Sequence, residues 1–276
     1  MENSKRLQRE GGAATLSVNN LGKRFSASEW AVRGLTFDCY PGEVVGLLGE
    51  NGAGKTTTLR ILATTLMPTE GRAIVAGFDV RHRQSDVRRS VGILFGGRSG
   101  LYDRLTAREN IRYFAELNGI SGVEFDRRLE ETSEMLEMKP FLDRRASAFS
   151  TGMVQKTSIA RSIIHNPAVL LLDEPSSGLD VAASRNIYQF IRMYRDLGKT
   201  VLFSSHNMEA AGRICDRVII IHRGEIRMIG TPEELITLSE TEKGPEEGPD
   251  QGEIQGRKPI GGPFERAFLK LTGGGS

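Results

Sequence analysis

The sequence contains little cysteine, no long hydrophobic run and no excess of either charge. Its two cysteines, Cys39 and Cys215, are too few for a disulfide scaffold or a cysteine-based zinc site, and two isolated thiols suit a reducing cytosol. No stretch approaches the roughly 18 apolar residues of a transmembrane helix. Residues 1–14 are polar and lack the apolar segment of a signal peptide. We therefore expect a protein that reaches a membrane only through a separate partner.

The charge balance excludes a globally basic or acidic protein. Lys and Arg number 37 and Asp and Glu number 35, so the net charge is +2. This balance provides no overall field for binding nucleic acid or an anionic membrane, and no nucleic-acid partner is predicted. Hydrophobic residues form 38% of the 276 residues and charged residues 26%, which is ordinary for a globular chain with a substantial core.

Short apolar runs alternate with helical patterns over about residues 15–235. The runs at 44–48 and 169–172 are too short for helices and predict buried strands. The alternation predicts an α/β fold with a mostly parallel sheet covered on both faces. A helix-rich block at about 98–165 interrupts it and predicts an inserted lobe. Further strands are predicted at 16–18, 35–37, 201–204 and 218–221 and within 71–95, and helices at 55–66, 106–138, 150–164 and 185–197.

The composition changes after residue 235. Residues 243–263 contain six Gly and four Pro, and their only aliphatic residues are Ile254 and Ile260. Such a segment buries too little apolar surface to order itself, so it predicts a flexible linker; a tether or regulatory segment is the alternative. Residues 264–271 form a short amphipathic segment that we expect to dock on the rest of the chain. The tail is therefore placed at 236–276.

The strongest local motif is the sequence GENGAGKT at residues 49–56, which fits G-x-x-x-x-G-K-[ST] between a predicted strand and a predicted helix. Glycines let backbone N–H groups turn toward phosphate oxygens, and the helix N-terminus adds a positive dipole. Lys55 provides a charge for the β- and γ-phosphates, and Thr56 a hydroxyl for Mg²⁺. The alternative is a glycine-rich turn with an unrelated lysine. The candidate nucleotide-binding residues here are Gly49, Asn51, Gly52, Ala53, Gly54, Lys55, Thr56 and Thr57.

Two acidic residues, Asp173 and Glu174, directly follow the second apolar run, Val169–Leu172. Open α/β sheets bind ligands at the carboxyl ends of their strands. In that position Asp173 is predicted to orient Mg²⁺, and Glu174 to polarise the water that attacks the γ-phosphorus. The alternative is a surface acid pair that caps the following helix.

Three further segments complete a recognisable order of motifs. They are FSTGM at 149–153, SGLD at 177–180 and the histidine in SSH at 204–206. With the two motifs above, and with Phe25 lying 24 residues before Gly49, the chain resembles the ATP-binding subunit of an ABC transporter over about residues 15–235. The resemblance implies a P-loop NTPase with a RecA-like parallel sheet, an antiparallel β subdomain and an inserted helical lobe.

The resemblance also implies roles for single residues. Phe25 is similar to the aromatic that stacks on adenine, although a core aromatic is the alternative. His206 is similar to the histidine that contacts the γ-phosphate, although a structural hydrogen-bonding role is the alternative. Ser150 and Gly152 are similar to the signature residues that face a nucleotide on a second subunit, although Ser150 alone would be a plain helix cap. Asp180 belongs to the loop that is similar to the family's D-loop.

Two expectations concern partners and cargo. Because one chain carries a single phosphate loop and a separate signature helix, the resemblance implies two ATP molecules held between two head-to-tail chains, with a homodimer as the simpler case. The segment GLYDRLTAREN at 100–110 and the FSTGM form of the signature are similar to the sodium-exporting NatA-type branch of the ABC-2-type exporters. This implies an ATPase at the cytoplasmic face of the cell membrane, bound to an integral membrane permease.

The sequence departs from the family pattern at three places. Gly97 occupies the position where the family places a glutamine that contacts Mg²⁺, so that contact is predicted to be missing or supplied otherwise. The signature has Thr151 in place of Gly and Met153 in place of Gln, whereas Ser150 and Gly152 are retained, so a competent site is expected. The Gly- and Pro-rich segment at 243–263 is the third departure.

Two other functional classes compete with a transporter subunit. A soluble ABC ATPase acting on ribosomes or DNA remains an alternative, but the chain has one cassette, no heptad repeats and no strongly basic arm. A small-molecule kinase built on a phosphate loop would need an acceptor pocket, and the pairing of Glu174 with His206 argues against it.

Overall fold

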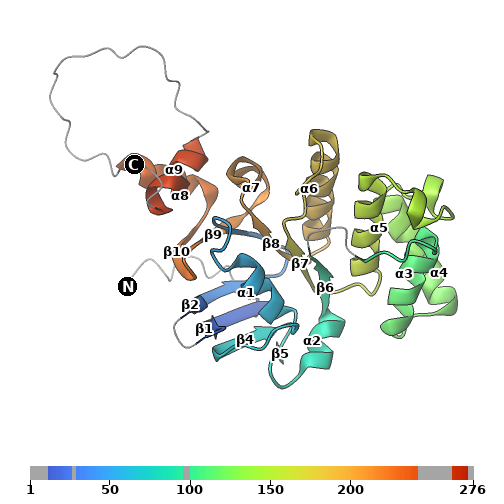
Figure 1. Cartoon of the computed structure of the whole chain (residues 1–276), viewed down its shortest axis with the longest axis horizontal. Helices are drawn as coiled ribbons and strands as arrows, with labels where there is room; N and C mark the ends of the chain where they lie inside the picture. The colour runs from blue at the N-terminus through green and yellow to red at the C-terminus, as the bar shows by residue number, and fades with distance from the viewer. Residues whose placement is uncertain (1–11, 27–28, 96–99, 242–262, 273–276) are drawn as a thin grey trace, which may run out of the picture.

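The computed structural model describes residues 12–26, 29–95, 100–241 and 263–272. Two β-sheets form the centre of the molecule, and a helical lobe lies at one end (Figure 1). The larger sheet has the strand order β10-β9-β3-β8-β7-β6 and the smaller one the order β2-β1-β4-β5. The larger sheet comprises β3 (Val44–Leu48), β6 (Val91–Leu94), β7 (Val169–Asp173), β8 (Thr200–Ser205), β9 (Arg217–His222) and β10 (Glu225–Gly230), and the smaller one β1 (Leu16–Arg24), β2 (Trp30–Cys39), β4 (Glu70–Val75) and β5 (Phe78–Asp79).

The larger sheet is buried on both faces, which explains the uninterrupted apolar runs that predicted its strands. Its strands from β9 to β6 are parallel, and only β10 is antiparallel. Alternate residues of each strand enter two separate cores: Leu47 and Leu171 face the core shared with α1 (Lys55–Leu62) and the smaller sheet, whereas Leu48 and Leu172 face the core on the other side. The predicted parallel sheet and antiparallel β subdomain are confirmed.

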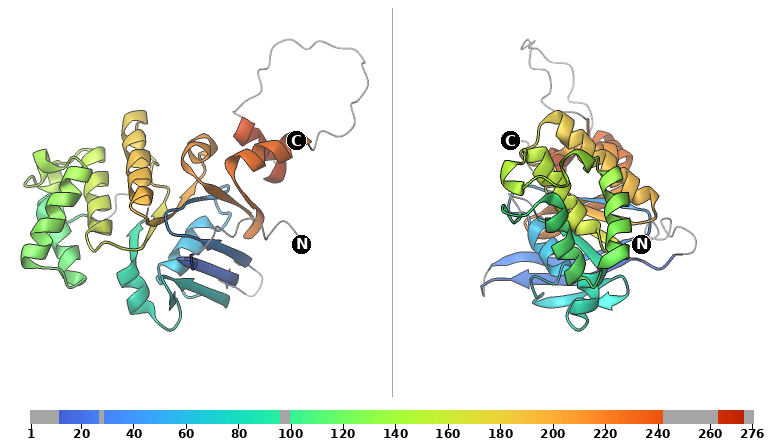
Figure 2. Two further views of the ribbon diagram at one scale, coloured as in Figure 1. Left: turned by 180° about the vertical axis from the view of Figure 1, so that it is seen from behind. Right: turned by 90° about the vertical axis from the view of Figure 1, so that its right-hand side faces the viewer.

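The predicted helical lobe is present, but the helical pattern at 106–138 is divided between two helices, α3 (Ala107–Leu117) and α4 (Gly122–Met135). Gly119 adopts φ +77, and its N–H donates to Glu116 O while that of Ile120 donates to Ala115 O. These bonds form a Schellman ending, which continuous apolar spacing does not reveal. The two helices pack with α5 (Thr151–Ile163) at the end of the molecule opposite α8 (Pro232–Thr241) and α9 (Pro263–Thr272), as Figure 2 shows from behind.

A buried asparagine fastens the loop that leads into the lobe. Asn110 is fully buried, and its Oδ1 accepts from Tyr102 N at 2.8 Å. Its Nδ2 donates to three carbonyl oxygens, those of Tyr102, Leu105 and Thr106. Thr106 and Glu109 form a capping box at the start of α3. These bonds explain the asparagine that ends the segment 100–110, because its side-chain amide accepts one hydrogen bond and donates several at the same position.

Replacing Asn110 with Asp is expected to lower the free energy of unfolding by about 2–3 kcal/mol at neutral pH. The carboxylate cannot donate, so it would lie unpaired against three carbonyl oxygens. Because this burial would raise the pKa of the new carboxyl above its unfolded value, the penalty should grow as pH rises above about 4 and shrink below it. Urea unfolding at two pH values measures the effect, with the exposed Asn186→Asp as the control. An equal effect of both substitutions would contradict the explanation.

The C-terminal amphipathic segment docks as expected. It forms α9, which packs on α7 (Met208–Ile214) and α8. Phe264, Ala267 and Phe268 of α9 are buried, and a side chain at Gly212 of α7 would lie 3.5 Å from the Phe264 ring. Of the predicted linker at 243–263, residues 243–262 lie outside the described part, and Pro263 is the first residue of α9. The expected start of the tail, residue 236, lies within α8.

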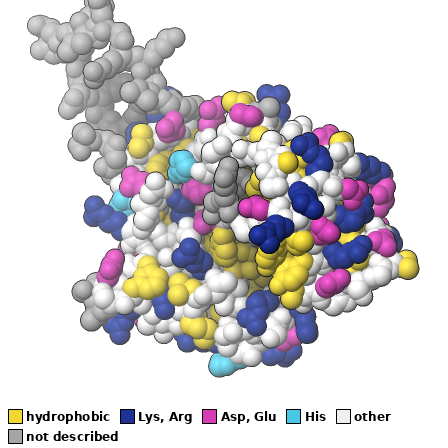
Figure 3. Space-filling model, turned by 45° about the vertical axis from the view of Figure 1, so that its right-hand side comes forward, with side chains coloured by type: hydrophobic (Ala, Val, Ile, Leu, Met, Phe, Trp, Pro, Cys, Tyr) yellow, Lys and Arg dark blue, Asp and Glu magenta, His cyan; other side chains and the backbone are white. Residues whose placement is uncertain are grey.

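The remaining α-helices of the described ranges are α2 (Gln84–Ser90), beside the smaller sheet, and α6 (Val181–Asp196), which at 16 residues is the longest of those described. Two short 3₁₀-helices lie at Lys139–Phe141 and Ala146–Ala148. Within the described ranges, no helix is both long and apolar enough to span a lipid bilayer. Positive and negative side chains are interspersed over the face displayed in Figure 3, which agrees with the balanced composition.

Candidate functional site

The phosphate loop connects β3 to α1 and requires glycine at two positions for steric reasons. A side chain at Gly49 would place its Cβ 2.3 Å from the carbonyl oxygen of Ile221. Gly54 precedes α1 with φ +106, and a Cβ there would lie 2.5 Å from the oxygen of Ala31. Asn51 and Gly52 are exposed, whereas Ala53 is buried. The loop therefore bends closely around the end of β3 with its tip open to solvent.

Lys55, the first residue of α1, is buried and points into this loop. Its Nζ donates to the carbonyl oxygens of Gly49 at 2.6 Å and Glu50 at 3.1 Å, and lies 3.6 Å from Oε1 of Glu174. Burial lowers the pKa of the Lys55 ammonium below its usual value, and the Glu174 carboxylate partly opposes that shift. The cation is thus held between loop carbonyls and a carboxylate in a partly desolvated position, where its charge acts strongly on a bound anion.

Thr56 and Asp173 meet across the sheet. The Thr56 hydroxyl lies 3.0 Å from Oδ1 and 2.9 Å from Oδ2 of Asp173, which is buried at the end of β7. A hydroxyl and a carboxylate are oxygen ligands of the kind that Mg²⁺ prefers, and Mg²⁺ usually takes only one or two protein ligands beside water and phosphate. Among the described residues no group of three or more His, Cys, Asp or Glu side chains is arranged for a metal. The donor set therefore fits Mg²⁺ bound together with a nucleotide.

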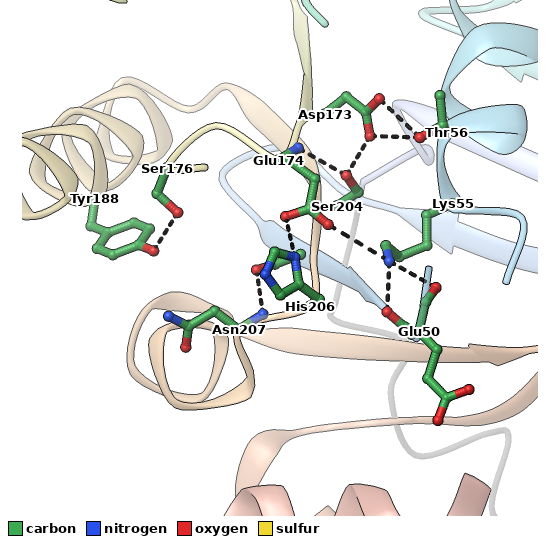
Figure 4. A network of polar contacts seen from close by, with 12 residues as sticks. Glu50, Lys55, Thr56, Asp173, Glu174, Ser176, Tyr188, Ser204, His206 and Asn207 are labelled. Carbon is green, nitrogen blue, oxygen red and sulfur yellow. Dashed lines mark hydrogen bonds and ion pairs between the residues drawn. The ribbon is translucent and has the colours of Figure 1, made fainter. Parts of the chain in front are cut away.

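Glu174 and His206 form a pair beside Asp173 (Figure 4). Oε2 of Glu174 lies 2.8 Å from Nδ1 of His206, and Oε1 faces Lys55. Glu174 has φ +49, a left-handed conformation that is unusual for glutamate. This turn directs its side chain away from the buried strand and toward Lys55 and His206. The His206 side chain is 58% exposed, so its ring borders solvent at the rim of the site.

Asp173, Glu174 and His206 lie at the carboxyl ends of the neighbouring strands β7 and β8, and Lys55 and Thr56 begin the helix that follows β3, the strand on the other side of β8. Asp173 of β7 pairs with Ser204 of β8, and Leu48 of β3 pairs with Ser205 of β8. The phosphate loop, the two acids and the histidine therefore lie together at one edge of the sheet, and the acids end and follow a buried strand, as the apolar run before them predicted.

The signature residues lie elsewhere, on the helical lobe. The Ser150 side chain accepts a hydrogen bond from Met153 N at 3.3 Å, so the predicted helix cap at the start of α5 is confirmed. Ser150 is exposed, and a Cβ added at Gly152 would meet nothing within 4 Å. Figure 1 shows α5 separated from α1 along the molecule by β6 and β7. The start of α5 borders an open cavity of about 640 Å³, which Gly100 and Phe149 also line, and it lies at a distance from the phosphate loop of its own chain.

Three other predicted residues have simple surroundings. Asp180 caps α6 by accepting from Ala183 N at 2.7 Å. The Phe25 side chain is 63% exposed, which excludes the core alternative, and Lys23 Nζ lies 5.5 Å from its ring centroid. Thr57 is half-buried in the first turn of α1. Gly97, the predicted departure from the glutamine position, lies outside the described residues.

Two residues in the site were not singled out by sequence reasoning. The buried Ser204 hydroxyl contacts both Asp173 and Glu174. Gln155 of α5 donates to the carbonyl oxygen of Pro175 at 2.8 Å and so joins the helical lobe to the segment after Glu174. The sequence marked Ser204 only by its place two residues before the candidate histidine, His206. It marked Gln155 only by its place in the helix that follows the signature motif.

Comparison with known proteins places these features in one family. A family model described as ABC transporter matches residues 32–177. The ABC transporter ATP-binding protein NatA of Bacillus subtilis is 46% identical over 212 residues, which cover 77% of this chain and 86% of the relative. The Nod factor export ATP-binding protein I of Ralstonia nicotianae is 36% identical over 231 residues, covering 82% and 70%.

A solved structure extends the likeness to three dimensions. It is described as a dimeric post-hydrolysis state of the ATP-binding cassette MJ0796 bound to ADP and Pi. It superposes on this chain with a TM-score of 0.70 and 27% identity, covering 78% of this chain and 98% of that one.

Proposed function

This chain belongs to the ABC transporter family, and from that premise we propose that it powers an exporter. It is an ABC transporter ATP-binding subunit that hydrolyses ATP, with ATP and Mg²⁺ as its cofactors. The observation that carries the ATP-hydrolysing role is the convergence of Lys55, Thr56, Asp173, Glu174 and His206 at one edge of the parallel sheet, whereas export rests on the likeness to relatives.

The proposed roles follow from the contacts. Lys55 neutralises the β- and γ-phosphates. To reach them, its ammonium would give up its hydrogen bonds to the carbonyl oxygens of Gly49 and Glu50. Thr56 and Asp173 hold Mg²⁺, which neutralises phosphate charge when bound. Glu174 accepts a proton from the attacking water. His206 donates from Nδ1 to the Glu174 carboxylate and so holds it in place, and with both ring nitrogens protonated it would also donate from Nε2 to the γ-phosphate. The nucleotide lies against backbone N–H groups of residues 49–57.

A second subunit completes the site in this proposal. Ser150 and Gly152 lie at the start of a helix that borders an open cavity, and Asp180 precedes another helix. A helix N-terminus attracts anions, so a head-to-tail second copy would place α5 over the phosphate loop of its partner. The dimeric MJ0796 structure supports this arrangement by likeness. Size-exclusion chromatography of the wild type with a non-hydrolysable ATP analogue should show a dimer that dissociates on nucleotide removal, and a monomer under both conditions would contradict it.

The membrane partner and cargo are also proposals. We assign residues 15–235 to the ATPase domain, with the lobe at about 98–165 facing an integral permease on the cytoplasmic side of the membrane. The likeness to NatA and to a Nod factor export protein supports export, with Na⁺ or another ABC-2-type cargo. ATP-dependent closure moves the permease only if ATP binds the closed state more tightly than the open one.

Affinity purification of a tagged chain from gently solubilised membranes tests the partner. We expect one protein with several apolar membrane spans to co-purify with the chain in a fixed stoichiometric ratio. Recovery only with ribosomal or DNA-associated proteins would replace the transporter with a soluble ABC ATPase. The cargo is tested in inside-out vesicles containing the chain and its permease, where ATP should drive Na⁺ inward; vesicles that hydrolyse ATP without moving Na⁺ would require a different cargo.

Replacing Phe25 with Ala is expected to weaken ATP binding at least about fivefold, since base stacking on an aromatic side chain contributes about 1–3 kcal/mol. Because the ring is exposed, the free energy of unfolding should change little. Calorimetric titration of the variant and of Phe25→Tyr, which keeps the ring, measures the effect. Binding of inorganic tripolyphosphate should be the same for all three proteins. Tyr113→Ala removes an exposed aromatic of the lobe and is the control.

A further inference from the structure

We propose that Ser204 is a positioning residue whose single hydroxyl group joins the carboxylate of Asp173, the proposed metal ligand, to the backbone N–H of Glu174, the residue proposed to activate water. It lies at the carboxyl end of β8, directly opposite Asp173 in the register with β7. Its side chain is fully buried. Figure 4 shows the Ser204 hydroxyl between Asp173 and the backbone nitrogen of Glu174. The inference rests on the proposed roles of these two acids.

The direction of both hydrogen bonds is fixed by the groups involved. The Glu174 backbone N–H can only donate, so it donates to Ser204 Oγ at 3.0 Å. A hydroxyl has a single hydrogen, and it goes to Asp173 Oδ1 at 2.6 Å. Donation to a carboxylate makes this a charge-assisted bond, stronger than one between neutral groups. The hydroxyl therefore links the two acids in one defined orientation.

The link holds Glu174 in an unfavourable backbone conformation. A non-glycine residue in the left-handed region costs about 1–3 kcal/mol and persists only where its surroundings enforce it. Ser204 fixes the nitrogen of Glu174, and the Ser177 N–H donates to its carbonyl oxygen at 3.0 Å. Without the hydroxyl, the N–H would lose its partner and the backbone could relax toward a commoner conformation. The carboxylate would then turn away from Lys55 and His206.

The same hydroxyl restricts Asp173. Oδ1 of Asp173 receives Ser204 and lies within hydrogen-bond distance of Thr56, so the carboxylate plane is defined by one residue from β8 and one from α1. Groups that orient metal ligands typically affect metal affinity or activity by about 10–100-fold when they are replaced. Loss of Ser204 should therefore disturb Mg²⁺ binding and the hydrolytic step together.

The test compares Ser204→Ala with Ser204→Thr, which keeps the hydroxyl, and with Ser204→Cys, which fills the site with a poor donor. Thr200→Val is the matched control, because it removes another buried hydroxyl of β8, one that donates to Tyr40 O at the opposite end of the strand. For Ser204→Ala we expect kcat to fall about 10–100-fold and the Mg²⁺ dependence of equilibrium ATP binding to shift about 3–10-fold, with unchanged ATP affinity in EDTA. Threonine should restore most of both properties and cysteine less.

The outcomes separate this inference from the proposed function. If Glu174→Gln loses ATP hydrolysis and Ser204→Ala keeps the wild-type rate, the inference is overturned while the proposed function stands. Hydrolysis unaffected by Glu174→Gln would overturn the role of Glu174, and the inference with it. If kcat falls in Ser204→Ala, Ser204→Thr and Thr200→Val in proportion to the unfolding free energy that each variant loses, the serine is merely structural. That result would overturn the inference. If Ser204→Ala does not fold, the order of kcat among serine, threonine and cysteine decides.

Discussion

Replacing Glu174 with Gln is expected to lower steady-state ATP hydrolysis by about 10²–10⁴-fold, the usual contribution of a general base, while ATP binding stays near that of the wild type. Glutamine has the same shape and can still accept from His206, whose Nδ1 lies 2.8 Å from the carboxylate. It cannot take a proton from water. The charge opposite Lys55 would also be lost, so nucleotide binding should if anything strengthen.

Phosphate release and calorimetric binding of ATP measure these two effects separately. Glu225→Gln is the matched control, because it makes the same chemical change at an exposed position of β10. In the proposed dimer, Glu174→Gln should also remain dimeric with ATP itself, since the bound nucleotide persists. A variant that retains more than about a tenth of the wild-type rate would assign the base to another group.

Replacing Lys55 with Met is expected to weaken ATP binding about 100-fold or more. Hydrogen bonds from a charged donor contribute about 1.5–3 kcal/mol each, and this ammonium has two phosphates within its proposed reach. Methionine is of similar length and apolar, so the buried position should remain filled. The fold should therefore survive, and the loss should concern nucleotide binding rather than folding.

Lys55→Arg sharpens the interpretation of this result. A guanidinium is planar and larger than an ammonium, and the slot between Gly49 O and Glu50 O is buried and short, so arginine should restore little affinity. Lys156→Met, which breaks an ion pair with Glu137 on the helical lobe, is the control for loss of a lysine charge. Equilibrium binding of a non-hydrolysable analogue is the measurement. Recovery of wild-type affinity in Lys55→Arg would show that charge alone determines binding.

The sequence placed those parts of the site whose residues follow one another within a single motif. Lys55 and Thr56 follow a strand within a single motif, and Asp173 and Glu174 end a strand, so local pattern was sufficient to place them. Ser204 is different, because its role depends on the register between β7 and β8. No spacing along the chain states which strands are neighbours. The contact of Gln155 with Pro175, between the lobe and the core, escaped for the same reason.

The same distinction holds for the fold. The apolar runs of β3 and β7 predicted buried strands because both faces of the sheet are covered. The pattern at 106–138 missed the break between α3 and α4, although Asn118 and Gly119 are suitable residues for a helix ending. Periodicity continued through the turn, since both helices bury residues in the same core. The docking of α9 was expected, but its partner helices were not identifiable.

The position of β3 has a consequence for synthesis of the chain. This strand carries the phosphate loop, yet its neighbours in the sheet are β8 and β9, with Val44 beside Val201 and Val45 beside Arg217. A ribosome makes the chain from the N-terminus, so the loop emerges long before the strands that support it. Until β8 and β9 are made, β3 has neither of its neighbours in the sheet, and β7, which carries Asp173, has only β6 beside it, so the nucleotide site is incomplete. Because β9 ends at His222, nucleotide can stabilise this site only after that residue has been synthesised, and until then both edges of β3 lack their partner strands.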